Sequence, residues 1–203
     1  MDTPDFFATV PGIRLRDPLA DFLGAAAGGV LEYGYVDAVK LAGHSCPTVA
    51  STYWLTRQAL RALYRDDLPE RGAVRVELAA DIGDGVAGVV ANVASLLTGA
   101  AGVGGFKGLG GRFDRRNLLV FAAQVPLELR YSRMDGRGQI DAGARMDRVP
   151  ASPELGPLLQ RCVAGIADAS ERRELGRLWQ DRVRRLLLEH AEDPDVFVVR
   201  ESA

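Results

Sequence analysis

The sequence predicts an α+β fold, with a body of mixed helices and strands over residues 1–150 and a helical C-terminal extension over 151–203. Three observations support this prediction. Apolar residues recur at helical spacing over 46–64, and they alternate with charged residues over 73–79. Two prolines near residue 150 then separate the body from two further helical patterns. With 203 residues and 47% hydrophobic content, the chain can bury a sizeable core.

The first half of the body is predicted to begin with short elements and to include one long helix. Asp17 and Pro18 have the residue types of a helix cap and a first helical residue, and the glycines of 24–29 end that short helix. In order, the predicted elements are a loose N-terminal segment over 1–16, a helix over 17–23, a strand over 30–36, a helix over 46–64, a turn over 66–72 and a strand over 73–79.

The second half is predicted to surround a glycine-rich segment with strands and helices. Asp84 is a natural N-cap for an almost wholly apolar helix, a composition typical of a buried helix. Asp168 and Glu171 have the pattern of a capping box. In order, the predicted elements are a helix over 86–97, the glycine-rich segment over 99–116, strands over 118–123 and 127–132 that pair with each other, a weaker strand over 139–147, helices over 153–167 and 168–190, and an edge strand over 196–200.

Tyr33, Tyr35 and Asp37 alternate along the strand predicted over 30–36, so they would share one face of a sheet. If that face is directed toward the turn that contains His44 and Cys46, Tyr33 and Tyr35 are candidate ligand-binding residues. A cross-strand aromatic pair on a packed sheet explains the same alternation without a ligand. Both interpretations stay open.

His44 and Cys46 stand two positions apart in a chain that contains only two His and two Cys. Gly43 before them and Pro47 after them place His44 on a turn and Cys46 at the start of a helix. At that position free N–H groups and the helix dipole favour a thiolate. The imidazole adds either a proton acceptor or a second soft metal ligand. A buried Cys beside a His that bonds the backbone is the alternative.

Ten of the chain's 23 glycines lie between Gly83 and Gly111. This density indicates unusual backbone torsions or close approach of the backbone to another group. The pattern completes neither the dinucleotide-binding fingerprint nor a Walker loop. We expect the segment to act as a lid over the His44–Cys46 turn and to bind a small anionic molecule, with a subunit contact as the alternative. Its candidate cationic groups are Lys107, Arg112, Arg115 and Arg116.

The run Gly43-His44-Ser45-Cys46-Pro47 resembles the G-H-x-C-P signature of the formylmethanofuran dehydrogenase E-subunit family. The resemblance continues through the spacing of a strand Glu and two later acidic residues, and it covers residues 30–145. The matching segments are Glu77, Asp81 and Asp84, with Asp81 where the family often has Cys; Thr98-Gly99-Ala100, where the family has T-G-C; and Lys107-Gly108 with Arg116-Asn117-Leu118, which resemble the halves of a G-K-G-N element.

The resemblance implies an antiparallel sheet flanked by helices, and a homodimer. It also implies a divalent transition metal held by His44 and Cys46 with help from Asp81 or Asp84, since a His, a Cys and a carboxylate from a second element suit such an ion. Zinc is the expected metal and iron the alternative. The Cys-rich C-terminal module of several family members has no counterpart in residues 151–203.

Three functions are compatible with these patterns. The first is a metal-binding protein with a small anionic ligand. The second is an enzyme with Cys46 as nucleophile, His44 as base and an anionic substrate bound by the glycine-rich segment. The third is an accessory subunit without a small-molecule site. A net charge of −2 gives no reason to expect a nucleic acid or a membrane as partner. Since no signal-peptide pattern and no long apolar run is present, we expect a soluble cytoplasmic protein.

Overall fold

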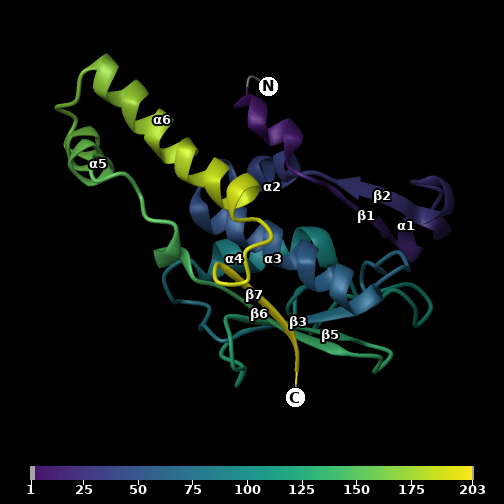
Figure 1. Cartoon of the computed structure of the whole chain (residues 1–203). Helices are drawn as coiled ribbons and strands as arrows, with labels where there is room; N and C mark the ends of the chain where they lie inside the picture. The colour runs from purple at the N-terminus through teal and green to yellow at the C-terminus, as the bar shows by residue number, and fades with distance from the viewer. Residues whose placement is uncertain (1–2, 203) are drawn as a thin grey trace.

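The computed structural model describes residues 3–202 and confirms an α+β fold (Figure 1). The main sheet has five strands in the order β4-β3-β5-β6-β7, in which β3 and β4 are parallel and the other neighbours are antiparallel. A second, two-stranded sheet pairs β1 with β2. The strands are β1 (Ile13–Arg16), β2 (Val30–Tyr33), β3 (Val74–Leu78), β4 (Leu119–Val120), β5 (Leu129–Arg133), β6 (Gln139–Ala144) and β7 (Phe197–Glu201).

Within the described residues, six α-helices and four short turns of other helix types complete the fold. None of these helices has both the length and the apolar character that crossing a membrane requires. The α-helices are α1 (Pro18–Phe22), α2 (Tyr35–Ala42), α3 (Pro47–Tyr64), α4 (Ala87–Thr98), α5 (Leu155–Val163) and α6 (Ala169–Arg184). The shorter turns are η1 (Asp5–Thr9), η2 (Ala27–Gly29), η3 (Met146–Arg148) and η4 (Arg185–Glu189), and η4 continues α6 as a π-helical turn.

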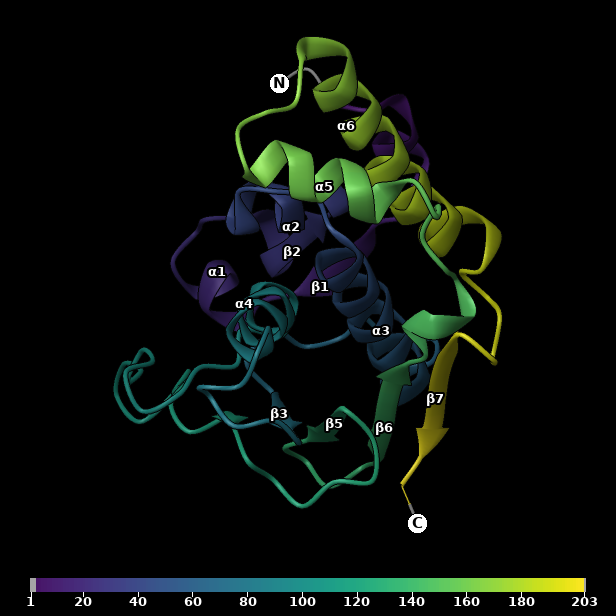
Figure 2. The same ribbon diagram turned by 90° about the vertical axis from the view of Figure 1, so that its left-hand side faces the viewer.

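The helices α3 and α4 lie on one face of the main sheet, and α2 with the small sheet lies beyond them (Figures 1 and 2). The residues of β3 show why one face is covered. Val74, Val76 and Leu78 are buried, and they alternate with the partly exposed Arg75 and Glu77. The hairpin of α5 and the start of α6 stands out from the body (Figure 1).

Helix α3 forms the centre of the core, as the helical spacing predicts. Cys46 caps its N-terminus by accepting a hydrogen bond from the N–H of Val49 (3.4 Å), and Pro47 is its first residue. On the sheet side, the hydroxyl of Thr56 bonds the hydroxyl of Tyr131 in β5 (2.7 Å), and both side chains are fully buried. The helix therefore presents its N-terminal turns at a fixed position over the sheet.

The N-terminal third differs from the prediction in two places. The strand β1 pairs with β2 inside a segment predicted to be loose. The predicted strand over 30–36 is wrong beyond Tyr33, because the N–H of Gly34 donates to the carboxylate of Asp37 (2.8 Å) and α2 begins at Tyr35. Tyr33 and Tyr35 therefore do not share the face of a strand.

The strands after the glycine-rich segment are joined differently from the prediction. A direct pair between β4 and β5 is wrong, because β3 lies between them with β4 on one side and β5 on the other. The chain leaves β3, passes through α4 and returns as β4 parallel to β3, which a helical crossover allows. The strand β5 therefore pairs with the distant β3 and not with β4, which is its neighbour in sequence.

The C-terminal segment shares the core of the body. The capping box is confirmed, since Asp168 accepts hydrogen bonds from the N–H groups of Ser170 and Glu171, and the Glu171 carboxylate accepts from the N–H of Asp168. The predicted edge strand is confirmed as β7, which pairs with β6. Val196 and Phe197 are buried in the same core cluster as α3. The end of the predicted extension thus returns to the sheet of the body.

Candidate functional site between α3 and α4

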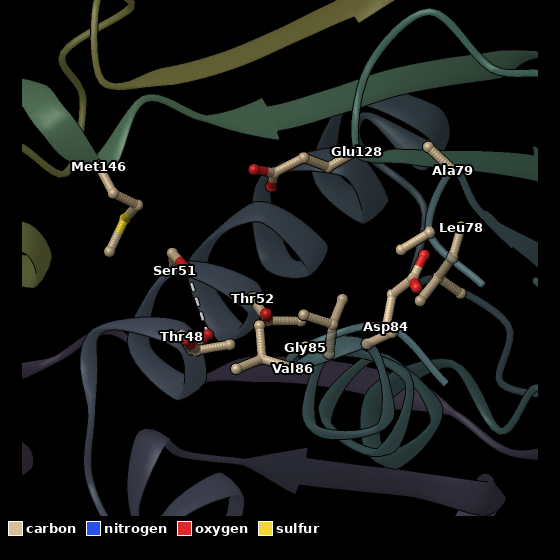
Figure 3. Close-up of a pocket in the computed structure, with 13 residues that line it drawn as sticks. Thr48, Ser51, Thr52, Leu78, Ala79, Asp84, Gly85, Val86, Glu128 and Met146 are labelled. Atoms are coloured by element: carbon tan, nitrogen blue, oxygen red, sulfur yellow. Dashed lines mark hydrogen bonds between the residues drawn. The ribbon is translucent and has the colours of Figure 1, made fainter. Parts of the chain in front are cut away.

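A cavity of about 400 Å³ lies between the first turns of α3 and the start of α4, and we call it the α3–α4 cavity (Figure 3). Its size is in the range of small-molecule sites, and most of its wall is apolar. The lining residues are Thr48, Ser51 and Thr52 from α3; Leu78, Ala79 and Ala80 from the end of β3; Asp84, Gly85, Val86, Ala87 and Val90 around the start of α4; and Glu128 and Met146 from the sheet side.

Glu128 supplies a carboxylate to this apolar wall. The residue as a whole is exposed, but its carboxylate points into the hollow between Met146 and Ser51 (Figure 3). The surrounding protein removes water from this group and raises the pKa of Glu128, while a hydrogen bond from the N–H of Ala144 (3.3 Å) partly opposes that rise. A carboxylate in such a place gains from a ligand that brings a positive charge or a hydrogen-bond donor.

Three hydroxyl-bearing residues in the first turns of α3, Thr48, Ser51 and Thr52, line the same cavity as Glu128. Ser51 and Thr52 are buried, and the hydroxyl of Ser51 donates to the carbonyl of Thr48 (3.2 Å). Within residues 3–202 the hydroxyl of Thr52 makes no hydrogen bond, although its carbonyl accepts one from Thr56. The cavity therefore combines an apolar wall with a few polar groups that can orient a ligand.

Asp81 and Asp84 close a turn at the rim of the cavity. The Asp84 carboxylate accepts from the N–H of Asp81 (3.0 Å), and the Asp81 carboxylate accepts from the N–H of Gly83 (3.1 Å). The predicted role of Asp84 as helix cap is wrong, because α4 begins at Ala87 and its cap position is Val86. In Figure 3 the Asp84 carboxylate points toward the end of β3.

His44 and Cys46 lie on a turn that the C-terminal helix holds in place. The hydroxyl of Ser45 bonds Tyr35 (2.8 Å) and Gln180 (2.9 Å), and its carbonyl accepts from the indole of Trp179 (3.1 Å). His44 is exposed, while Cys46 is partly buried and its sulfur caps α3. The contact with α6 fixes the backbone between the two side chains.

The ring of His44 has a defined orientation. Its Nδ1 lies 2.9 Å from the carbonyl oxygen of Ala42. A carbonyl only accepts hydrogen bonds, so Nδ1 carries the proton, and Nε2 of the neutral ring keeps its lone pair. Histidines that bind metals use this arrangement.

The residues implied as metal ligands are not gathered into one set. Over residues 3–202, no three His, Cys, Asp or Glu side chains lie together in a way that would hold a metal ion. The carboxylates of Asp81 and Asp84 accept hydrogen bonds within their own turn, His44 bonds the carbonyl of Ala42, and the sulfur of Cys46 caps α3. A metal at His44 and Cys46 therefore needs a further ligand from outside this set.

The two tyrosines lie apart from the α3–α4 cavity. Tyr35 is fully buried, and its ring packs edge-on against Phe7 and Tyr53. The carbonyl of Tyr33 accepts a hydrogen bond from the hydroxyl of Tyr53 (3.3 Å), and the guanidinium of Arg71 lies 5.8 Å from the Tyr33 ring. The predicted cross-strand aromatic pair is wrong, because Tyr35 lies in α2 and the cross-strand partner of Tyr33 is Ile13. The hydroxyl of Tyr35 does reach the turn between His44 and Cys46, where it bonds Ser45 (2.8 Å).

The glycine-rich segment lies at the far end of α4 from Asp84. Its contacts are with α1 and the residues before β3: the ring of Phe113 lies 5.3 Å from that of Phe22, and Gly99 lies so close to Gly72 that a Cβ atom on Gly99 would be 3.2 Å from the backbone nitrogen of Gly72. Lys107 is exposed and lies outside the lining of the α3–α4 cavity, as does Arg112. The role of this segment as a lid over His44 and Cys46 stays a prediction.

The sequence contained a signal for this cavity. Thr48, Ser51 and Thr52 are polar residues at positions i, i+3 and i+4 in the first, mainly apolar turns of the helix, so they share one face. Glu128 lies in a strand predicted over 127–132, and nothing near it in sequence shows that it lines the same cavity as those hydroxyls. Only the sheet brings it there.

Comparison with known proteins adds no family to this description. No protein-family model matches the chain, and no curated protein matches it.

Proposed function

We propose that this protein binds a small organic cation, such as an amine with an apolar body, in the α3–α4 cavity. The observation that carries the proposal is the Glu128 carboxylate, which points into a hollow whose described lining contains no Lys, Arg or His. An ammonium group would compensate the charge of that carboxylate, and the apolar wall would hold the rest of the molecule. The hydroxyls of Ser51 and Thr52 would orient the ligand.

Benzylamine tests this proposal against two molecules of the same shape, benzyl alcohol and benzoate. Isothermal titration at constant ionic strength should show saturable binding of the amine, weaker binding of the alcohol and the weakest binding of the acid. Glu128→Gln should weaken amine binding by about tenfold or more, because a charge-assisted hydrogen bond is lost. Ser51→Leu should block all three molecules by filling the cavity.

Glu192→Gln is the matched control, because Glu192 is exposed and lies outside the cavity lining. Equal binding of benzylamine and benzoate, or equal binding by the wild type and Glu128→Gln, would show that the carboxylate does not select the ligand.

A second candidate function is the binding of a divalent metal, zinc or iron, at His44 and Cys46. The observation that favours it is the hydrogen bond from His44 Nδ1 to Ala42, which leaves Nε2 as the available nitrogen. The third ligand would come from a bound molecule or a second copy of the chain, which the predicted homodimer would provide.

Elemental analysis of protein purified without an affinity tag tests the metal hypothesis. It should find close to one metal per chain, and Cys46→Ser and His44→Gln should each remove most of it. A metal content that stays unchanged in both variants would place the metal elsewhere, and a metal-free wild type would contradict the hypothesis.

A further inference from the structure

A second cavity, of about 330 Å³, lies beneath the glycine-rich segment, and we call it the loop cavity. Three arginines line it: Arg71 before β3, and Arg112 and Arg115 in the segment itself. Arg71 and Arg115 also line a neighbouring, more apolar hollow beside α1, so their guanidiniums stand between the two spaces.

Arg71 and Arg115 share a single buried carboxylate. Asp17 accepts from Nη2 of Arg115 (2.7 Å) and from Nη1 of Arg71 (3.0 Å), and it also caps α1 through the N–H of Leu19. Asp17 and Arg115 are both more than nine-tenths buried. Two guanidiniums against one carboxylate leave a positive charge in a place where an uncompensated charge is costly.

The other carboxylates that line the loop cavity have arginine partners of their own. Glu70 lies 3.6 Å from Arg16, and Asp114 forms a close pair with Arg116 (2.6 Å). Neither of these arginines lines the loop cavity. The acids at its wall therefore leave the charge of Arg71, Arg112 and Arg115 incompletely balanced.

Several N–H groups of Arg71 and Arg115 are still available for hydrogen bonds. Arg71 donates through Nε to the carbonyl of Leu96 (3.2 Å) and through Nη1 to Asp17, and Arg115 donates only through Nη2 to Asp17. In the part of the chain that the structure describes, Nη2 of Arg71 and the Nε and Nη1 groups of Arg115 make no hydrogen bond. Arg112 rests over the ring of Phe113, 4.7 Å from its centre, and forms no ion pair within residues 3–202.

Glycines give the Arg115 guanidinium its space. A Cβ atom at Gly99 would lie 2.2 Å from Nη1 of Arg115, and one at Gly72 would lie 2.7 Å from its Nε. Both glycines have a positive φ, at 71° and 90°. Gly72 and Gly99 therefore leave the space that the buried Arg115 side chain occupies.

We propose that the loop cavity is a binding site for a small oxyanion, a phosphate or a carboxylate, held by Arg71, Arg112 and Arg115. The anion would balance the excess positive charge and accept the remaining guanidinium hydrogen bonds, which suit the planar geometry of both groups. The site is independent of the α3–α4 cavity and does not use Lys107.

Isothermal titration with inorganic phosphate and with succinate, at an ionic strength held constant with NaCl, tests the site. Saturable binding of either anion is expected, and the stronger of the two identifies the source of the oxyanion. Arg112→Gln should weaken anion binding at least tenfold, because a charge-assisted hydrogen bond is lost. Arg112 is exposed, so this substitution should leave the buried cluster intact. The melting temperature of this variant without anion should stay within 2 °C of the wild type, which separates lost binding from lost folding.

Arg116→Gln is the matched control. It removes the same charge from the same segment, but Arg116 pairs with Asp114 and lies outside the lining of the loop cavity. Unchanged binding in Arg116→Gln together with loss in Arg112→Gln supports the site. Equal losses in both variants, or no saturable binding of either anion to the wild type, would overturn it.

Discussion

The two ends of α4 carry opposite chemistry. Near its N-terminus lie the carboxylates of Asp81, Asp84 and Glu128, and within the described residues none of them forms an ion pair. The helix has twelve residues and is therefore about 18 Å long. Near its C-terminus, Arg71 and Arg115 donate hydrogen bonds to Asp17. This distribution also suits the helix dipole, which favours acids at the N-terminal end and cations at the C-terminal end.

Charged side chains have different roles at the two ends of α4. At the basic end, ion pairs of Asp17 with Arg71 and Arg115 hold the glycine-rich segment against α1, so loss of these pairs should alter stability. At the acidic end, carboxylates face a hollow or close a short turn, so changes there should alter ligand binding more than stability. Variants at matched positions test this distinction.

Removal of the Asp17 charge should have the largest effect. Asp17→Asn keeps a side chain that can cap α1 but leaves two arginines without their shared counter-charge, which typically costs about 3–5 kcal/mol. Thermal unfolding at pH 7 should show a melting temperature lower by about 10 °C. Asp21→Asn on the same helix removes an exposed pair with Arg16 and should change stability by about 1 kcal/mol or less.

The effect of Asp17→Asn should also depend on pH. Burial raises the pKa of Asp17, but hydrogen bonds from Arg115 and Arg71 outweigh burial and leave it below its ordinary value. A lowered pKa in the folded state contributes stability above the unfolded pKa near 3.8, and that contribution is lost as the pH falls through the folded value. The gap between wild type and Asp17→Asn should therefore shrink below pH 4, and a constant gap down to pH 2 would contradict this account.

Gly99→Ala should destabilise the protein by about 2–4 kcal/mol. The added methyl group meets the Arg115 guanidinium, and the positive φ adds its own cost. Gly110→Ala is the matched variant, since φ is also positive there but no atom lies within 4 Å of the new Cβ. Urea unfolding should show about 1 kcal/mol for Gly110→Ala. Equal losses would mean that the contact with Arg115 is unimportant.

Substitution of Cys46 separates capping from chemistry. Cys46→Ala should lose about 1 kcal/mol in urea unfolding, because the N–H of Val49 loses its acceptor, while Cys46→Ser should retain the cap and most of the stability. A Cys46→Ser variant that is as stable as the wild type but has lost its metal or its reactivity would assign the thiol a chemical role. Equal stability of the Ala and Ser variants would show that the cap contributes little.

Glu128→Gln should have the smallest effect on stability. Unlike the variants above, it should make the protein more stable. Burial raises the pKa of Glu128, and a raised folded-state pKa means a stability contribution that is present below the unfolded value and is lost as the pH rises through the folded value. The ionised side chain is therefore unfavourable at pH 7, where the neutral amide should raise the melting temperature by about 1–2 °C. The gain should vanish near pH 4, and a gain of the same size at both pH values would contradict the assignment to charge.

Local patterns were sufficient to predict the elements whose stability is local. The helix over 46–64, the capping box at Asp168 and the alternation of β3 follow from contacts between residues two to four positions apart, and the structure contains all three. Where two local signals competed, prediction failed. Tyr35 fits a strand by alternation, but the capping contact of Asp37 with Gly34 starts a helix there.

Both candidate sites depend on contacts that no local pattern encodes. Arg115 reaches Asp17 across 98 positions, and Glu128 faces Ser51 because β5 pairs with β3 underneath α3. The sequence suggested four cations for one anion site, yet Arg115 is paired with Asp17 and Arg116 with Asp114, while Arg71 comes from outside the segment. Spacing along the chain sets which residues share a face of one element. The topology and register of the sheet, which bury distant segments against each other, set which faces meet.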